Sequence, residues 1–247
     1  MSETGWSPYC GAAPLPAELL GRWNFDPWLL AALAIGAGAY AFVSRDAGRE
    51  QRLGFSAAWL ILILLFVSPL CALSSALFSI RVAHHLLLAV AAAPLLVLAF
   101  PRPAGARTNL TLWTGVQAIT FWVWHSPPAY AAALSSDLLY WTMQASLLGS
   151  AILFWSAVRR AAPAAGVAAL LVSMVQMGLL GGLITFAPQP LYAPHFLTTS
   201  PWGFSPLEDQ QIAGLVMWVP AAGAYLGAAL YLLWRYLGAD PARATAR

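Results

Sequence analysis

Histidine is the residue type in this sequence best suited to bind a metal ion or move a proton. Three of the four copies, His84, His85 and His125, lie inside or at the ends of apolar segments. Ionisable side chains are costly in a membrane and often functional there, so we expect this group to bind or transfer a ligand. On a helix His84 and His85 point about 100° apart, so one of them should face a given site.

Methionines in other apolar segments could complete a soft ligand set with these imidazoles, namely Met143, Met174 and Met177. Met174 and Met177 are three positions apart and share one face of a helix. Imidazole and thioether together favour copper, here as Cu(I), over magnesium or calcium. Core packing is the commoner role of a single methionine, so that alternative stays open.

A second group of residues is expected to orient these ligands or to face a partner. It comprises Arg81, His195, Asp209, Gln210 and Met217. An acidic residue such as Asp209 near the start of a helix is favoured by the helix dipole, and it could also fix a histidine tautomer or bind the metal itself. For His195, a hydrogen bond to a carbonyl or a headgroup at the membrane interface is the simpler role.

Composition places these residues in a membrane protein. The chain is 60% hydrophobic and only 9% charged, whereas a soluble domain carries roughly 25% charged residues. So few charges cannot cover a water-exposed surface. All twelve basic residues are arginines spread over short gaps between apolar runs, which argues against a nucleic-acid partner.

Seven segments are long and apolar enough to cross about 30 Å of hydrocarbon as helices. They cover about 27–44, 54–78, 82–100, 110–125, 138–158, 164–187 and 212–236. Pro69 and Pro94 lie inside two of them and predict kinks. We therefore predict an all-α polytopic protein with a seven-helix membrane domain over residues 27–236, an outer N-terminal tail over 1–26 and a cytoplasmic tail over 237–247.

The arginines predict the orientation, because cytoplasmic loops carry an excess of positive charge. Ten fall on one side of the predicted segments, namely Arg45, Arg49, Arg52, Arg102, Arg107, Arg159, Arg160, Arg235, Arg243 and Arg247. Only Arg22 and Arg81 fall on the other. The N-terminus should therefore lie outside and the C-terminus in the cytoplasm. All four histidines then share the outer side, with His84 and His85 in the first turn of the third segment.

Two regions outside the segments carry further expectations. The two cysteines, Cys10 and Cys71, are too few and too far apart in sequence to predict a disulfide framework. The connection over residues 187–211 is unusually long and rich in proline and aromatic residues. Exposed Tyr192 and Phe196 there could belong to a lid or a docking surface, or lie among the lipid headgroups.

Four strings, in this order and spacing, resemble the CtaG family of cytochrome c oxidase assembly factors, the seven-span type associated with caa-type oxidases. They are HHLLLAVAAAPLLVLAFP from His84, FWVWHSPPAY from Phe121, ITFAPQPLYAPH from Ile184 and SPLEDQQIAGLVMWVP from Ser205. The resemblance covers nearly the whole chain from Trp23 to about Tyr236. It implies a multi-pass protein of the bacterial plasma membrane that matures a haem–copper oxidase by handling copper.

The resemblance also bears on individual residues. His84, His85, His125 and Asp209 lie in the matching strings. The family pattern often has another histidine near Met143 or Gln144, and one about four residues before His85, where this chain has Arg81. Methionine could replace such a histidine as a soft ligand for Cu(I), whereas arginine could not.

The resulting prediction is a copper-handling assembly factor that is not an enzyme, because no bond is made or broken. Copper from a donor on the outer side would bind the histidines and methionines and pass to an oxidase subunit in the membrane. One alternative is a haem-binding or electron-transfer protein with two histidines as axial ligands between helices. A transporter is disfavoured, because the segments hold almost no charged residues at mid-depth.

Overall fold

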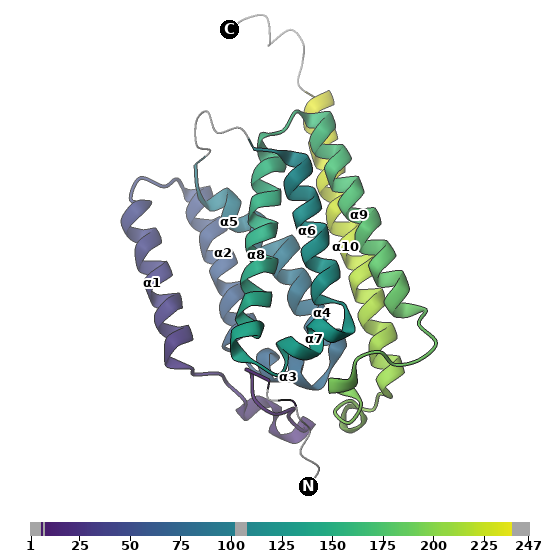
Figure 1. Ribbon diagram of the computed structural model, residues 1–247. Helices are drawn as coiled ribbons and strands as arrows, with labels where there is room; N and C mark the ends of the chain where they lie inside the picture. Colours follow the sequence, from purple (N-terminus) through teal and green to yellow (C-terminus); the bar gives the residue numbers. More distant parts are fainter. Residues whose placement is uncertain (1–5, 7, 102–107, 239–247) are drawn as a thin grey trace, which may run out of the picture.

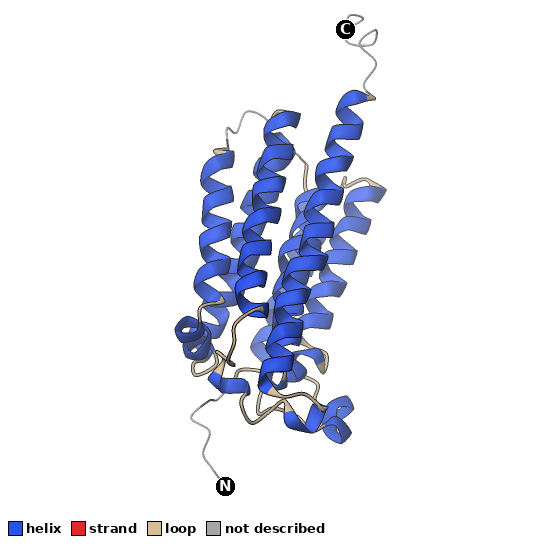
Figure 2. Ribbon diagram, turned by 90° about the vertical axis from the view of Figure 1, so that its right-hand side faces the viewer, coloured by secondary structure: helices blue, strands red, loops and turns tan. Residues whose placement is uncertain are grey.

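A computed structural model describes residue 6 and residues 8–101 and 108–238, and the secondary structure within these ranges consists of helices joined by loops (Figure 1; Figure 2). The helices are α1 (Pro27–Val43), α2 (Arg49–Phe66), α3 (Leu70–Ala76), α4 (Phe78–Leu86), α5 (Ala93–Ala99), α6 (Leu110–Trp124), α7 (Pro127–Ala133), α8 (Asp137–Arg160), α9 (Pro163–Thr185) and α10 (Pro206–Leu237). A π-helical stretch, Leu87–Ala92, joins α4 to α5. Short 3₁₀ turns cover Pro16–Gly21, Ala193–His195 and Ser200–Trp202.

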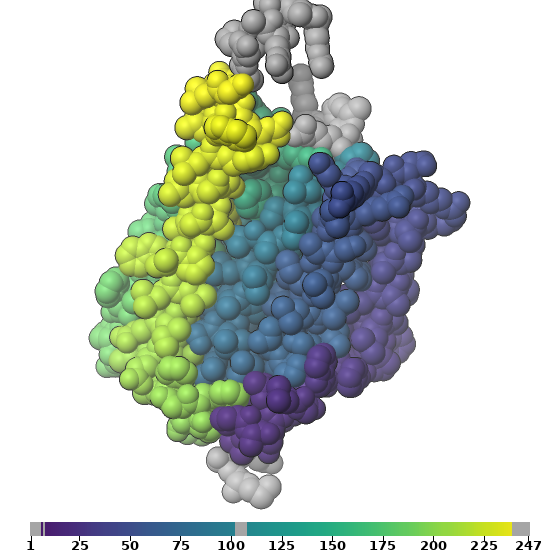
Figure 3. Space-filling model, turned by 180° about the vertical axis from the view of Figure 1, so that it is seen from behind, coloured from purple at the N-terminus to yellow at the C-terminus, as the bar shows by residue number. Residues whose placement is uncertain are grey.

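The long helices run side by side and alternate in direction along the chain (Figure 1). One end of the bundle is closed by the N-terminal segment 8–26, by α3 and α7, and by the loop 186–205 that precedes α10; we call it the capped end. Figure 3 shows the N-terminal segment lying beside that loop. The two are joined by a hydrogen bond that the Trp202 indole N–H donates to the Pro14 carbonyl, at 3.2 Å.

Helix length and composition identify a multi-pass membrane protein. Four helical units of the described chain are long and apolar enough to cross a bilayer: Phe78–Ala99, Asp137–Arg160, Pro163–Thr185 and Pro206–Leu237. A fifth is the pair α2 and α3, which together pass the same test but are bent by 48°. The outward faces carry large apolar side chains, for example Leu60, Leu179 and Leu183, which are 60–67% exposed. Such a surface is suited to lipid and would be costly in water.

Several predicted boundaries agree with the structure and others do not; α10, for example, begins at Pro206 rather than near residue 212. The predicted segments 110–125, 138–158 and 164–187 match α6, α8 and α9 to within two residues at each end. The predicted segment 54–78 starts too late, since α2 begins at Arg49, but the kink predicted at Pro69 is confirmed, because the chain bends there by 48° between α2 and α3. The third segment was placed too late, since α4 begins at Phe78 rather than near residue 82, so His84 and His85 lie in the last turn of α4 rather than in its first.

The disulfide expectation was also wrong. Cys10 and Cys71 form a disulfide with Cα atoms 5.3 Å apart, although 61 positions separate them in sequence. The N-terminal segment folds back against α3, which brings the two together. In the oxidised protein Cys71 is therefore not available as a thiolate ligand.

Local sequence explains most helix starts. The Asp26 carboxylate accepts hydrogen bonds from the backbone N–H groups of Trp28 and Leu29 and begins α1. Asn109 caps α6 in the same way. At α10, Ser205 and Glu208 form a reciprocal capping box. The residue before α4, Leu77, offers no such side chain, so the first N–H groups of α4 need another acceptor.

Close packing of α9 on α10 rests on glycine. A Cβ atom on Gly181 would lie 2.7 Å from the Gly214 carbonyl oxygen, and one on Gly214 would collide with Thr185. Small residues of this kind let membrane helices approach at backbone distance. This pair forms one side of the bundle, and the N-terminal half of α10 packs on α4, the helix that carries two of the histidines.

Candidate functional site

The start of α4 is fixed by a carboxylate from a distant part of the chain. Asp209, in the first turn of α10, accepts hydrogen bonds from the backbone N–H groups of Phe78 (2.7 Å) and Ser79 (3.2 Å). It also accepts one from the Ser79 hydroxyl, at 2.5 Å. Both carboxylate oxygens are thus used to cap α4, and the negative charge lies at the positive end of its dipole. Asp209 thereby anchors the helix that carries Arg81, His84 and His85.

His85 and His125 form a direct pair between α4 and the end of α6. His85 Nδ1 lies 3.4 Å from His125 Nε2, and the two rings are nearly perpendicular. His125 Nδ1 lies 2.8 Å from the Phe121 carbonyl, which can only accept, so this nitrogen carries the proton and Nε2 presents a lone pair. Histidines that bind metals usually donate their second N–H to a carbonyl or carboxylate in this way.

Further imidazole nitrogen atoms at this place have no protein partner among the described residues. They are Nε2 of His85 and both ring nitrogens of His84. Both side chains are at most 2% exposed. The ring of His84 meets the Phe66 ring edge-on, with centroids 4.9 Å apart, and its own centroid lies 6.1 Å from that of His85. Three imidazoles with available nitrogen atoms therefore gather in one buried place.

Arg81 lies one turn before these histidines on α4 and is completely buried. Its guanidinium carbon lies 5.3 Å from the centre of the Tyr140 ring on α8. The hydroxyl groups of Tyr130 and Tyr140 are close enough to interact with its charge, yet Nε, Nη1 and Nη2 make no hydrogen bond of regular geometry with a described residue. No carboxylate in the described chain forms an ion pair with it: Asp209, the other buried charge, is committed to the cap of α4.

The loop before α10 covers this cluster at the capped end. The Tyr192 hydroxyl donates a hydrogen bond to the His125 carbonyl at 2.7 Å, and its ring stacks on Phe78, with centroids 3.7 Å apart. Tyr192 is buried, so the expectation that it would be exposed was wrong, while Phe196 is 43% exposed as predicted.

His195 is a further buried member of that loop. Its Nδ1–H donates to the Ala76 carbonyl at 3.2 Å, so Nε2 accepts from the Tyr130 hydroxyl at 2.6 Å. Burial lowers the pKa of the His195 imidazole to about 3, although the hydrogen bond to Ala76 acts in the opposite direction. Burial likewise raises the pKa of the Tyr130 phenol. His195 is therefore neutral and serves to join the loop to α3 and α7.

The remaining predicted site residues are more dispersed. Met143 is fully buried on α8, which packs against α6. Met177 and Met217 are buried on α9 and α10, and Met174 lines a groove between these two helices. Gln210 holds the chain after α9, because its side chain bonds the Ile184 carbonyl and the Leu191 N–H. The described residues contain no group of three or more His, Cys, Asp or Glu side chains arranged to hold a metal ion.

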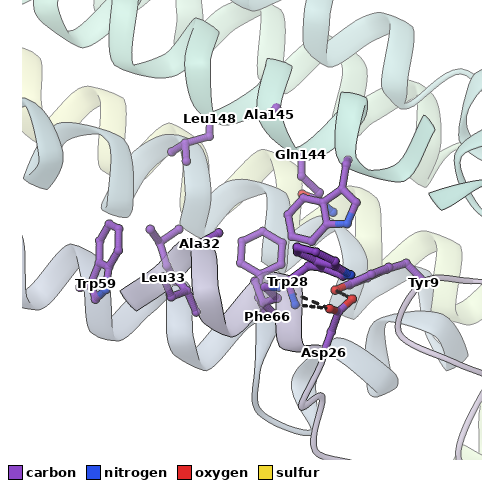
Figure 4. Close-up of a pocket in the computed structure, with 13 residues that line it drawn as sticks. Tyr9, Asp26, Trp28, Ala32, Leu33, Trp59, Phe66, Gln144, Ala145 and Leu148 are labelled. Atoms are coloured by element: carbon purple, nitrogen blue, oxygen red, sulfur yellow. Dashed lines mark hydrogen bonds between the residues drawn. The ribbon is translucent and has the colours of Figure 1, made fainter. Parts of the chain in front are cut away.

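A cavity of about 410 Å³ reaches the cluster from the side, between α1, α2 and α8 (Figure 4). Its lining is aromatic and apolar, with Trp28, Trp59 and Trp141 among the lining residues. The polar groups are Tyr9 and Asp26, which share a 2.7 Å hydrogen bond, and Gln144 on α8. Because the wall residue Phe66 also touches His84, one aromatic ring separates the cavity from that imidazole.

Comparison with protein families identifies the family to which the sequence belongs. Residues 36–239, which contain all four histidines and the whole of α2 to α10, match the sequence model of the cytochrome c oxidase caa3 assembly factor (Caa3_CtaG). The chain belongs to this family. The match covers most of the chain and confirms the resemblance found in the sequence. Comparisons with curated proteins and with solved structures found no match.

Membership of the Caa3_CtaG family associates the protein with the assembly of caa3 cytochrome c oxidase. Sequence reasoning selected Arg81, His84, His85 and His125, which the fold brings together. It missed Tyr130 and Tyr140, and it considered Gln144 only as a position near which the family often has histidine; these three complete the polar surroundings. Tyr130 belongs to the FWVWHSPPAY string, whereas no signal in the sequence singled out Tyr140.

Proposed function

We propose that this Caa3_CtaG protein binds copper as cargo at the capped end and delivers it to a cytochrome oxidase subunit in the membrane. The observation that carries the proposal is the buried pair of His85 and His125. Their nearest nitrogen atoms are 3.4 Å apart, and two imidazoles bound to one metal at about 2.0–2.1 Å each can span at most about 4 Å. His84 and Met143 are candidates for a third ligand. Neutral nitrogen with sulfur is a donor set that selects Cu(I).

The chemistry required of the chain is retention and release, so the protein needs no catalytic residue. The His125 Nδ1–H bond to Phe121 keeps the opposite nitrogen free for the cargo. Burial keeps water away from Cu(I), which limits its oxidation. The partner is then a subunit with a copper centre, and a copper donor reaches the protein from the outer side.

Haem is the competing cargo, and the geometry favours copper. Axial ligands lie on opposite faces of a porphyrin. His85 and His125 are in direct contact, so a haem between them would require α4 and α6 to separate. A colourless preparation without a Soret band would support copper over haem.

We further propose seven spans in the plasma membrane, with the N-terminus and the capped end outside and the C-terminus in the cytoplasm. Supporting this, the disulfide between Cys10 and Cys71 is at the capped end, and disulfides persist in oxidising compartments such as the cell exterior. The described arginines at the opposite end are Arg45, Arg49, Arg52, Arg159, Arg160 and Arg235. Arg102, Arg107, Arg243 and Arg247 lie outside the described residues.

Three proposed spans need explanation, since α1 has 17 residues and α6 has 15, and α2 is continued by the bent α3. At 1.5 Å per residue, α6 is about 22 Å long, so the short helix α7 beyond its end would sit near the membrane surface.

A phosphatase or fluorescent reporter fused after Leu237 and another fused before Trp6 test the orientation. Activity of the C-terminal reporter outside the cell would refute it.

The copper proposal is tested by loading the detergent-purified protein with Cu(I) in ascorbate, which maintains Cu(I) and leaves the disulfide intact. We expect about one copper per chain in the wild type. The double variant His85→Ala, His125→Ala should lose it. His195→Ala is the matched control, because it removes a buried imidazole that is already engaged by Tyr130 and Ala76. Unchanged copper content in the double variant would refute the proposal.

A further inference from the structure

Arg81 presents a problem that the copper proposal does not solve. A buried guanidinium offers five N–H donors and carries a permanent charge. Burying such a charge without a counter-charge costs several kcal/mol. Its neighbouring acceptors are the neutral hydroxyl groups of Tyr130 and Tyr140, and none of its three nitrogen atoms has a hydrogen bond of regular geometry in the described chain. Since the side chain is 0% exposed, bulk water does not reach it in this conformation.

Arg81 itself supplies a surplus of N–H donors, and its neutral neighbours do not offset its charge. Gln144 forms no hydrogen bond of regular geometry, although its amide interacts with the Tyr140 hydroxyl, and His84 has one N–H and one lone pair that are both unused. Charge from Arg81 acts on both His84 and His85. The Tyr130 hydroxyl is already committed as a donor to His195. An acceptor with negative charge would satisfy this surplus of N–H groups.

The one buried carboxylate nearby cannot play that part. Asp209 accepts from Phe78 and Ser79 with both oxygens, and no ion pair links it to Arg81. Withdrawing it would uncap α4. A negatively charged acceptor must therefore come from outside the described residues.

We infer that Arg81, with His84 and Gln144 beside it, forms a binding site for a small monovalent anion of the halide or carboxylate class. One guanidinium neutralises one negative charge. A divalent anion would leave a net charge buried in the same low-dielectric surroundings. Full burial limits the size, and the ring of Tyr140 covers one side of the guanidinium. The site stands without the copper proposal.

Access is provided by the cavity between α1, α2 and α8, because Gln144 lines it and lies next to Tyr140 on the same helix (Figure 4). A free anion would pass Gln144, and a carboxylate carried by a partner chain could reach the same place. The two sources share one chemistry, and the probes below distinguish them.

The test is equilibrium dialysis of the full-length, disulfide-intact protein in detergent, with gluconate as the background anion. Radiolabelled chloride and acetate are the two probes. We expect saturable binding of about one anion per chain. Chloride binding would indicate a site for a free ion, and binding of acetate alone would indicate a carboxylate site.

Variants connect the binding to the residue. Arg81→Gln should weaken binding by at least about tenfold, whereas Arg49→Gln, which changes an exposed arginine at the other end of the bundle, should leave it unchanged. Arg81→Lys keeps the charge but loses the planar fork, so it should bind more weakly than the wild type and still measurably. This variant decides the matter should Arg81→Gln fail to fold.

The inference is overturned if the wild type binds neither chloride nor acetate saturably. It is also overturned if Arg81→Gln binds the anion as tightly as the wild type. If Arg81→Gln does not fold, the same criterion applies to Arg81→Lys. Copper content, measured on the same samples in gluconate, keeps the two proposals apart. A wild-type protein that binds the anion but no copper would refute only the copper proposal. A wild-type protein that binds copper but no anion would refute only the anion site.

Discussion

Replacing Asp209 by alanine should release the start of α4. Two buried backbone N–H groups, those of Phe78 and Ser79, would lose their acceptor. An unsatisfied buried donor costs about 1–3 kcal/mol. The Ser79 hydroxyl can rotate to another acceptor, and the buried carboxylate's own desolvation cost disappears. We therefore expect the free energy of unfolding to fall by about 2–5 kcal/mol.

Backbone hydrogen exchange, measured by mass spectrometry in detergent, shows which helix loses protection in this variant. Exchange over the first turn of α4 should accelerate at least tenfold, since about 1.4 kcal/mol corresponds to a factor of ten. Glu208→Ala is the matched control, because the exposed Glu208 carboxylate bonds only Ser205 at the start of its own helix. That control should change exchange at the start of α10 and leave α4 protected.

Copper content separates capping from ligation at the same residue. If Asp209 acts by capping, copper loss in Asp209→Ala should accompany faster exchange at Phe78 and Ser79. Unchanged stability together with unchanged exchange at these two residues would refute the capping role. Copper loss with α4 still protected would make Asp209 a ligand instead.

Three further predictions follow from other contacts. Cys10→Ser should lower the free energy of unfolding by about 4 kcal/mol, as expected for closing a loop of this length, and the mobility of the protein on a non-reducing gel would confirm the lost disulfide. Gly214→Ala should destabilise the α9–α10 contact by about 1–3 kcal/mol in thermal unfolding, whereas Gly182→Ala, whose Cβ meets nothing within 4 Å, should not. The pKa of His195 is about 3 in the folded protein against about 6.5 in the unfolded chain. Its contribution to the free energy of unfolding is therefore complete above pH 6.5 and is lost as the pH falls. Between pH 7 and pH 5 the wild type should lose about 2 kcal/mol more stability than His195→Gln.

Helices whose ends carry their own signals were predictable from sequence. α9 follows Pro163 at its first position, and α8 ends at Arg159 and Arg160 in front of that proline. Apolar length between such signals suffices to place a helix to within about two residues. The membrane class follows from the same information, because hydrophobic length and scarcity of charge are properties of the sequence itself.

Features that depend on contacts across the fold could not be predicted. α4 begins at Phe78 because Asp209, 131 positions later, supplies its cap, and nothing near Leu77 indicates this. The disulfide joins residues 61 positions apart, and its formation depends on how the N-terminal segment folds back. The sequence placed the histidines at one end of the bundle, but that His85 meets His125 depends on how α4 and α6 are positioned.

The position of those two helices at the capped end is set largely by one stretch of chain. Asp209 holds the backbone of Phe78, and Tyr192 stacks on the Phe78 ring while its hydroxyl holds the His125 carbonyl. The start of α4 and the end of α6 are thus tied to the same loop and first turn of α10. Since the 3.4 Å separation of the imidazole nitrogens depends on both helix ends, movement of this loop would change the histidine pair without contact to either ring. We therefore expect movement of the segment between α9 and α10, which covers the histidine pair at the capped end, to change the proposed copper binding.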